Sequence, residues 1–247
     1  MIILLSNLVF IILDLFLFYI TFELILLPMF FIIFYFGSRN RKIIALYYFF
    51  IYTILGSLLL LLGLLFLYIE LGTNSLIILY SIPINEKFQC ILWILFFFSF
   101  AIKIPMFPFH IWLPYAHTES STITSIYLAA ILLKLGLYGF IRFSIPLFPY
   151  GTLYFKPLII TLALLSIVYT CISAFSLIDL KQIIAYSSIA HMNTAIIGLF
   201  SNDINGILGS ILYGISHGVI SSALFLMIGL LYDRFHTRII KYYRGLT

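Results

Sequence analysis

Charged residues are scarce in this sequence. Only 9% of its 247 residues are Asp, Glu, Lys or Arg, whereas 64% are apolar. A soluble globular domain is about a quarter charged, so this chain carries too little charge to solvate the surface of such a domain. The composition therefore excludes a soluble fold and indicates a protein whose solvent is the lipid bilayer.

Cysteine and catalytic motifs are also nearly absent. Cys90 and Cys171 lie in separate apolar runs, too few and too far apart for a disulfide framework or a metal cluster. The sequence has no glycine-rich phosphate loop and no nucleophile–base pair. Its 13 basic against 8 acidic residues are no signal for nucleic acid, because the basic residues are spread over loops.

Long apolar runs fill the sequence instead. A crossing needs ~20 apolar residues, and the runs are continuous, which favours helices over the alternating strands of a barrel. A helix also satisfies its own backbone hydrogen bonds in lipid. The predicted fold class is all-α, a polytopic transmembrane helix bundle that forms one domain over residues 1–247. The predicted spans are 14–36, 44–69, 89–117, 121–145, 158–178, 181–201 and 206–232.

The segment 1–13 is apolar but short. As a helix it extends only ~20 Å, and joining it to the next span would give a helix of ~50 Å. That length exceeds the ~30 Å hydrocarbon core. We therefore expect a partial helix followed by a reversal near Asp14.

The span 89–117 is predicted to be discontinuous. Pro105, Pro108 and Pro114 each remove a backbone donor. A broken helix is tolerated in a membrane where protein or water meets the freed backbone groups. A simple proline kink is the alternative, but Lys103 and His110 bracket the break and point to function.

The loop charges are asymmetric. Three basic residues, Lys87, Arg142 and Lys156, lie in the loops on one side. The loops on the other side carry eight, which places that side in the matrix or cytoplasm. Those eight residues are Arg39, Arg41, Lys42, Lys181, Arg234, Arg238, Lys241 and Arg244.

Five predicted spans each place a titratable side chain near their midpoint. A lysine at that depth costs ~3 kcal/mol, so such groups normally pair or line a water path. The proton affinity of a buried lysine depends on a nearby carboxylate, and histidine titrates near neutrality. Five such side chains on neighbouring spans are therefore suited to moving protons. A purely structural ion pair is the alternative for Glu23 and Lys103. A hydrogen-bonded interior role is the alternative for the two histidines. The five are Glu23, Lys103, Lys134, His191 and His217.

Three more polar residues follow the predicted break. His110 and His117 are seven residues apart, and Glu119 lies just beyond them. A metal site is the less favoured alternative, because no cysteine lies near. We expect these side chains to line a channel at the polar ends of the broken helix.

These residues lie in motifs that resemble a known family. The stretches FAIKIPMFPFHIWLPYAHTESS (100–121) and SIYLAAILLKLGLYGFIRF (125–143) closely resemble subunit 4 of the mitochondrial NADH dehydrogenase, respiratory complex I. FYITFELILLP (18–28), DLKQIIAYSSIAHMN (179–193) and SHGVISSALF (216–225) match three further helices of that family. The resemblance covers essentially the whole chain.

The resemblance implies an antiporter-like, proton-translocating subunit of the membrane arm in the mitochondrial inner membrane. It implies that Glu23 pairs with the pumping lysine Lys103, that Lys134 is a connecting lysine, and that His191 and His217 belong to a hydrophilic axis. The chain would be part of NADH:ubiquinone oxidoreductase without performing redox chemistry itself. NADH, FMN, iron–sulfur clusters and ubiquinone would belong to other subunits.

The sequence also departs from the family. Family members are nearly twice as long, and the proline expected after Glu119 is missing. We expect a split gene, in which a separate chain supplies the missing helices; truncation is the alternative. Two other functions stay open, a subunit of a cation/proton antiporter complex and a structural subunit that does not pump. The sequence does not distinguish H⁺ from Na⁺.

Overall fold

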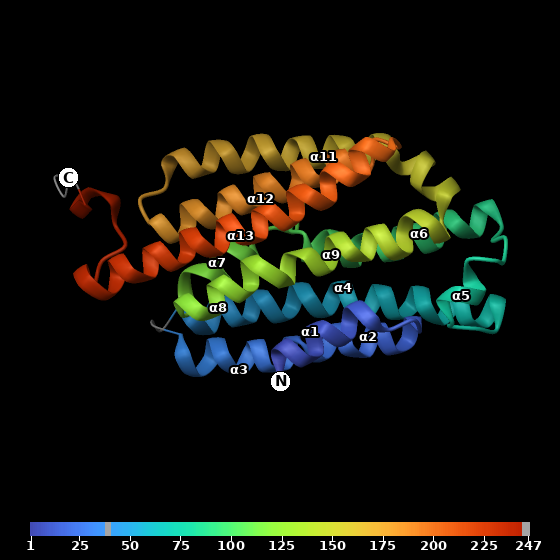
Figure 1. The fold of residues 1–247 in the computed structure, drawn as a ribbon, viewed down its shortest axis with the longest axis horizontal. Coiled ribbons are helices and arrows are strands. Elements are labelled where there is room, and N and C mark those ends of the chain that lie inside the picture. Colours follow the sequence, from blue (N-terminus) through green and yellow to red (C-terminus); the bar gives the residue numbers. More distant parts are fainter. Residues whose placement is uncertain (38–40, 244–247) are drawn as a thin grey trace.

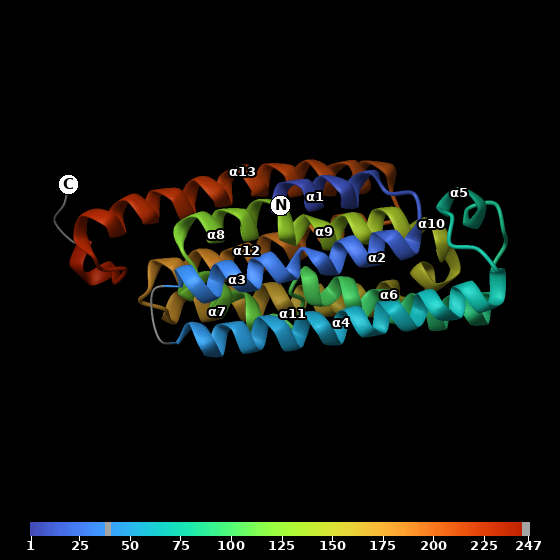
Figure 2. The same cartoon turned by 90° about the horizontal axis from the view of Figure 1, so that it is seen from below.

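The fold is a bundle of helices that run side by side along one long axis. A computed structural model describes residues 1–37 and 41–243. Figure 1 shows the helices in three tiers, and the view from below in Figure 2 shows the same common direction. The predicted residues Arg39 and Arg244 lie outside the described part of the chain.

The tiers follow the order of the sequence (Figure 1). The first tier contains α1 (Ile2–Ile11), α2 (Leu15–Leu24), α3 (Leu26–Phe36) and α4 (Lys42–Leu71). The middle tier contains α6 (Glu86–Lys103), α7 (Trp112–Glu119), α8 (Thr122–Tyr127), η1 (Leu128–Leu132), α9 (Leu133–Gly139) and η2 (Phe140–Ser144). The third tier contains α11 (Pro149–Ser176), α12 (Leu180–Leu199) and α13 (Ile204–Phe235). The short helices α5 (Leu76–Leu79) and α10 (Ile145–Leu147) lie in the connections, and the short helix η3 (Ile240–Tyr243) follows α13.

Five helical stretches are long and apolar enough to cross a membrane. No strand forms within the described residues, so the predicted all-α membrane bundle is confirmed. The stretches predicted at 89–117 and 181–201 are not among the five. The first is divided between α6 and α7, and α12 has a low mean hydropathy because polar side chains on it face the bundle. The five are Leu15–Phe36, Lys42–Leu71, Thr122–Leu147, Pro149–Ser176 and Ile204–Phe235.

Helix α11 begins nine residues before the predicted start at 158. Pro149 occupies its first position, where a missing N–H costs nothing, and Pro157 lies inside the helix. The sequence predicts a start at 158, just after Pro157, whereas the helix continues through that proline. Proline is tolerated inside transmembrane helices.

The first membrane span bends next to Glu23. Pro28 has no N–H to donate to the carbonyl of Leu24, and the helix is interrupted at Ile25 between α2 and α3. The two backbone bonds around the interruption, Ile25 N to Thr21 O and Met29 N to Ile25 O, are both stretched to 3.4 Å. The bend therefore lies within two residues of the glutamate.

Side-chain caps fix where several helices begin. Asp14 accepts hydrogen bonds from the backbone N–H of Phe16 and Leu17, which starts α2 and reverses the chain after α1. Asp179 caps α12 in the same way by accepting from the N–H of Lys181. Such caps satisfy backbone donors that a helix start leaves free.

The core between the tiers is mainly aromatic. Phe100 of α6 contacts Phe22, Phe140 and Phe143 through ring pairs with centroids 5.4–6.3 Å apart. Gly139 lets these rings approach, because a Cβ added there would lie 2.3 Å from Cε1 of Phe100. Within the middle tier, α6 and α9 therefore pack ring against backbone.

Candidate functional site

The broken helix supplies the centre of the candidate site. Helix α6 ends at Lys103 and α7 begins at Trp112, so the chain leaves helical geometry between them. The indole N–H of Trp112 donates to the carbonyl of Ile102 at 2.9 Å, and the N–H of Phe107 donates to the hydroxyl of Ser166 at 2.7 Å. Protein groups thus satisfy backbone that the break frees, as a membrane requires.

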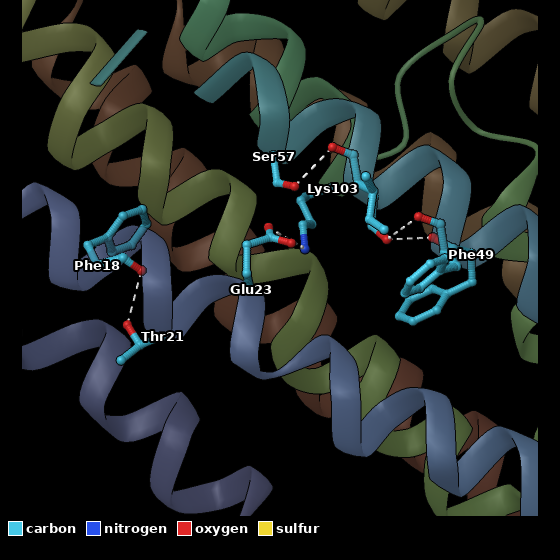
Figure 3. A network of polar contacts seen from close by, with 9 residues as sticks. Phe18, Thr21, Glu23, Phe49, Ser57 and Lys103 are labelled. Atoms are coloured by element: carbon cyan, nitrogen blue, oxygen red, sulfur yellow. Dashed lines mark hydrogen bonds and ion pairs between the residues drawn. The ribbon is translucent and has the colours of Figure 1, made fainter. Parts of the chain in front are cut away.

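Lys103 and Glu23 form an ion pair at this break. Their Nζ and Oε1 atoms are 3.9 Å apart, and the side chains are 2% and 19% exposed. Figure 3 shows the two side chains pointing toward one another, with Ser57 of α4 beside them. The ammonium also lies 4.3 Å from the ring centroid of Phe22, a favourable cation–π distance.

The pair is held loosely. Neither Lys103 Nζ nor Glu23 Oε1 makes a hydrogen bond within the described residues. Two opposite charges out of water attract one another strongly, but desolvation offsets much of that gain. The arrangement therefore keeps the charges in contact without locking them in one geometry.

Lys134 and His217 form a second polar contact. Lys134 Nζ donates to the carbonyl of Ala129 at 2.6 Å and lies 2.9 Å from Nδ1 of His217. The carbonyl belongs to η1, whose turns are wider than those of an α-helix; such turns are frequent at functional sites. Gly218 packs beside the lysine, since a Cβ there would lie 3.4 Å from Lys134 Cε.

His191 extends this contact to the surface of the bundle. Its ring centroid is 5.9 Å from that of His217, and its Nδ1 lies 2.6 Å from the hydroxyl of Tyr213. His191 and Ser216 are exposed. Together with Ile220 these residues line an open hollow of about 100 Å³. A hollow of this volume, lined partly by histidine, tyrosine and serine, is large enough for several water molecules.

The other predicted polar residues lie along the break and α7. His110 is buried against the rings of Phe107 and Tyr169. His117 is fully buried, and its ring stacks on Phe225 with centroids 4.5 Å apart. Neither ring nitrogen of His117 has a hydrogen-bond partner in the described structure. His117 therefore lies in the interior as a polar ring that no described side chain or backbone group satisfies.

Glu119 ends α7 and is 5% exposed. Its Oε2 atom has no hydrogen-bond partner among the described residues. The structure thus divides the predicted residues into one pair, Glu23 and Lys103, one trio, Lys134, His217 and His191, and three buried groups on the broken helix. No hydrogen bond or ion pair joins the pair to the trio within residues 1–37 and 41–243.

Two functional candidates were missed by the sequence argument. Lys181 and Arg238 were counted as loop charges, yet they are only 1% and 5% exposed. Lys181 Nζ donates to the carbonyl of Ser120 at 2.6 Å, and Arg238 Nη1 donates to that of Thr118 at 2.5 Å. Lys181 lies only two residues after Asp179. This short spacing could have shown that the lysine belongs to α12 and not to a loop.

The described residues contain no group of three or more His, Cys, Asp or Glu side chains close enough to hold a metal ion. The arrangement is a set of buried titratable groups on several helices. Such groups can bind, hold and release protons, but they offer no nucleophile poised for a covalent step.

Sequence comparisons place these residues in a family. The profile described as "NADH:quinone oxidoreductase/Mrp antiporter, TM" matches residues 13–247. NADH-ubiquinone oxidoreductase chain 4 of Prototheca wickerhamii is 59% identical over 237 residues, covering 96% of this chain and 45% of the relative. The protein of the same name from Marchantia polymorpha is 58% identical over 234 residues, covering 95% and 47%. The chain therefore spans about half the length of these relatives.

Solved structures give the same result. A chain of respiratory complex I from Thermus thermophilus superimposes with a TM-score of 0.89 at 36% identity, covering 94% of this chain and 50% of the other. A chain of the Mrp complex from Dietzia gives a TM-score of 0.78 at 27% identity, with coverages of 91% and 25%. The resemblance to complex I subunit 4 that the motifs indicated is confirmed, and this chain belongs to the NADH:quinone oxidoreductase/Mrp antiporter transmembrane family.

Proposed function

We propose that this chain is a proton-translocating subunit in the membrane arm of NADH:ubiquinone oxidoreductase, respiratory complex I, in the mitochondrial inner membrane. The identity to relatives named chain 4 of that enzyme supports the assignment. The chain contributes proton movement to the assembly. Redox centres and ubiquinone belong to other subunits.

The observation that carries the proposal is the buried pair of Glu23 and Lys103 at the break in the helix. An opposite charge within reach favours the protonated form of a lysine, and separation from that charge disfavours it. A change in the distance between the two side chains would therefore load and unload a proton at Lys103. The bend at Ile25 and the break after Lys103 give both side chains backbone that is able to shift.

The trio continues the route. A proton released near α6 reaches Lys134 in the adjacent helix α9 through water, since no protein contact bridges the two lysines among the described residues. Lys134 then exchanges it with His217 across 2.9 Å, and His191 receives it at the hollow. Histidine suits this step because both ring nitrogens carry protons in turn. His110, His117 and Glu119 line the broken helix and supply further proton sites.

A second chain completes the module in this proposal. The chain spans about half of its relatives, and the trio reaches the bundle surface at His191, Tyr213 and Ser216. A polar surface at the depth of the bilayer is costly against lipid. A partner bearing the missing helices would cover it and provide the proton exit.

A glutamate substitution tests the function. We expect Glu23→Gln to remove most proton translocation by the assembled complex, because a neutral amide no longer modulates the charge of Lys103. Proton uptake per electron is measured in proteoliposomes driven by NADH. Glu86→Gln is the matched control, since Glu86 is exposed at the start of α6. Normal pumping by Glu23→Gln would favour a structural role for the ion pair.

Purification separates complex I from an antiporter complex. A tagged copy of the chain should co-purify with subunits that carry iron–sulfur clusters, detected by their electron paramagnetic resonance signals. Recovery with antiporter subunits alone would contradict the assignment to complex I.

A further inference from the structure

The C-terminal end of α7 is buried, which is unusual for a helix end. A helix leaves its last four carbonyls without partners inside the helix, and an unpaired buried carbonyl is costly. Thr118, Glu119 and Ser120 at this end are 4%, 5% and 0% exposed. Water therefore does not satisfy these carbonyls, and protein groups must.

Two buried cations meet this requirement. Lys181 donates to the carbonyl of Ser120 and Arg238 donates to that of Thr118. Positive charge at a helix C-terminus also interacts favourably with the helix dipole, and hydrogen bonds from charged donors are stronger than neutral ones. Glu119 and Asp179 interact electrostatically with Lys181 and offset the repulsion between the two cations.

The two cations come from two elements that pair with each other. Lys181 lies in the first turn of α12, which the side chain of Asp179 caps. Arg238 lies in the segment 236–243, whose backbone pairs with the start of α12 through Leu180 N to Arg238 O at 3.0 Å and Ile240 N to Ile178 O at 3.2 Å. The Arg238 guanidinium also lies 4.5 Å from the ring centroid of Tyr232.

The same turn of α7 carries candidate proton sites. His117 precedes Thr118, and its own carbonyl accepts hydrogen bonds from the hydroxyls of Ser120 and Ser125. The cations therefore act on the backbone immediately after His117 and around Glu119. Movement of α12 or of the segment 236–243 would be transmitted to these two side chains.

We propose that Lys181 and Arg238 form a two-cation clamp that holds the C-terminal end of α7 and so positions His117 and Glu119. The clamp couples the second half of the broken helix to α12 and to the segment after α13. Both cations are positioning residues. This inference deepens the proposed function and rests on it where proton movement is concerned.

Hydrogen–deuterium exchange on the intact membrane complex tests the clamp directly. We expect Lys181→Met and Arg238→Gln each to speed exchange of the amides in 113–120 by about tenfold or more, as loss of a charged hydrogen bond allows. Exchange in α4 should not change. Lys241→Met is the matched control, because Lys241 is exposed in the same C-terminal segment.

Proton translocation gives the second readout. The proton-to-electron ratio should fall in Lys181→Met and recover at least partly in Lys181→Arg, which restores a charged donor.

Unchanged exchange in 113–120 would overturn the clamp, even if pumping is lost, since Lys181 would then act as a proton carrier. If Lys181→Met does not assemble, Arg238→Lys provides the test. This variant should assemble, and its exchange in 113–120 should lie between those of the wild type and Arg238→Gln. Wild-type exchange in both Arg238→Lys and Arg238→Gln would overturn the clamp. Exchange does not depend on pumping, so this result stands apart from the test of Glu23.

Discussion

At the scale of residues, the bundle combines a weakly held ion pair with a tightly held lysine. Lys103 is 3.9 Å from its acid and makes no described hydrogen bond, whereas Lys134 makes two contacts shorter than 3 Å. Desolvation makes a lone buried lysine costly. Lys103 offsets that cost with the opposite charge of Glu23, whereas Lys134 offsets it with a backbone carbonyl and the imidazole of His217.

The contact between Lys134 and His217 predicts a phenotype for the histidine. We expect His217→Phe to lower proton translocation several-fold, because the phenyl ring keeps the packing but cannot exchange a proton with Lys134. The proton-to-electron ratio in proteoliposomes is the measurement. His236→Asn is the control, since His236 is exposed at the end of α13 and asparagine tolerates the left-handed backbone there. Equal ratios in the two variants would remove His217 from the route.

Sequence reasoning located most of these residues but not all. The intramembrane charges stood out because a charge in a long apolar run is conspicuous. Lys181 and Arg238 did not, because they lie at the ends of runs, where loop charges are ordinary. Only the fold shows that the start of α12 and the segment 236–243 turn inward onto α7. Burial at a helix end depends on tertiary contacts that the local sequence does not encode.

At the scale of elements, interruptions are placed where the polar groups lie. The bend between α2 and α3 adjoins Glu23, the break between α6 and α7 adjoins Lys103, and the wide turns of η1 adjoin Lys134. Prolines explain the interruption between α2 and α3 and the break between α6 and α7. The widening at η1 has no proline, so the sequence could not predict it. Interior Pro157, by contrast, interrupts nothing.

Close packing between α6 and α9 predicts a stability difference between two glycines. We expect Gly139→Ala to destabilise the chain by about 1–3 kcal/mol, the usual cost of overpacking, because the new Cβ would overlap the ring of Phe100. Gly209→Ala is the control, since nothing lies within 4 Å of its added Cβ. Thermal unfolding of the purified complex, followed by loss of this subunit, is the measurement. Equal midpoints for the two variants would contradict the packing described.

At the scale of the whole molecule, the trio ends at an open hollow beside His191 on the surface of the bundle. Many large apolar side chains are exposed on the described helices, as lipid requires. The resemblance to longer family members predicts a second chain, but the sequence does not indicate which face such a chain would cover.

A bulky substitution tests whether a second chain covers this face. We expect Ser216→Trp to reduce recovery of the partner chain with the tagged subunit, because the indole would fill the hollow. Ile69→Trp is the control, since Ile69 is 77% exposed on α4 in the first tier, whereas the hollow is lined by α12 and α13. Mass spectrometry of the purified assembly gives the recovery. Full recovery with Ser216→Trp would place the partner on another face.

The central claim is that Lys103 carries protons because it is buried beside Glu23. The most direct test is the proton-to-electron ratio of the complex with Lys103→Met, compared with Lys87→Met, which removes an exposed lysine from the start of the same helix. We expect the ratio to fall in Lys103→Met and to stay at the wild-type value in Lys87→Met, with both complexes fully assembled. A wild-type ratio in Lys103→Met would contradict the account.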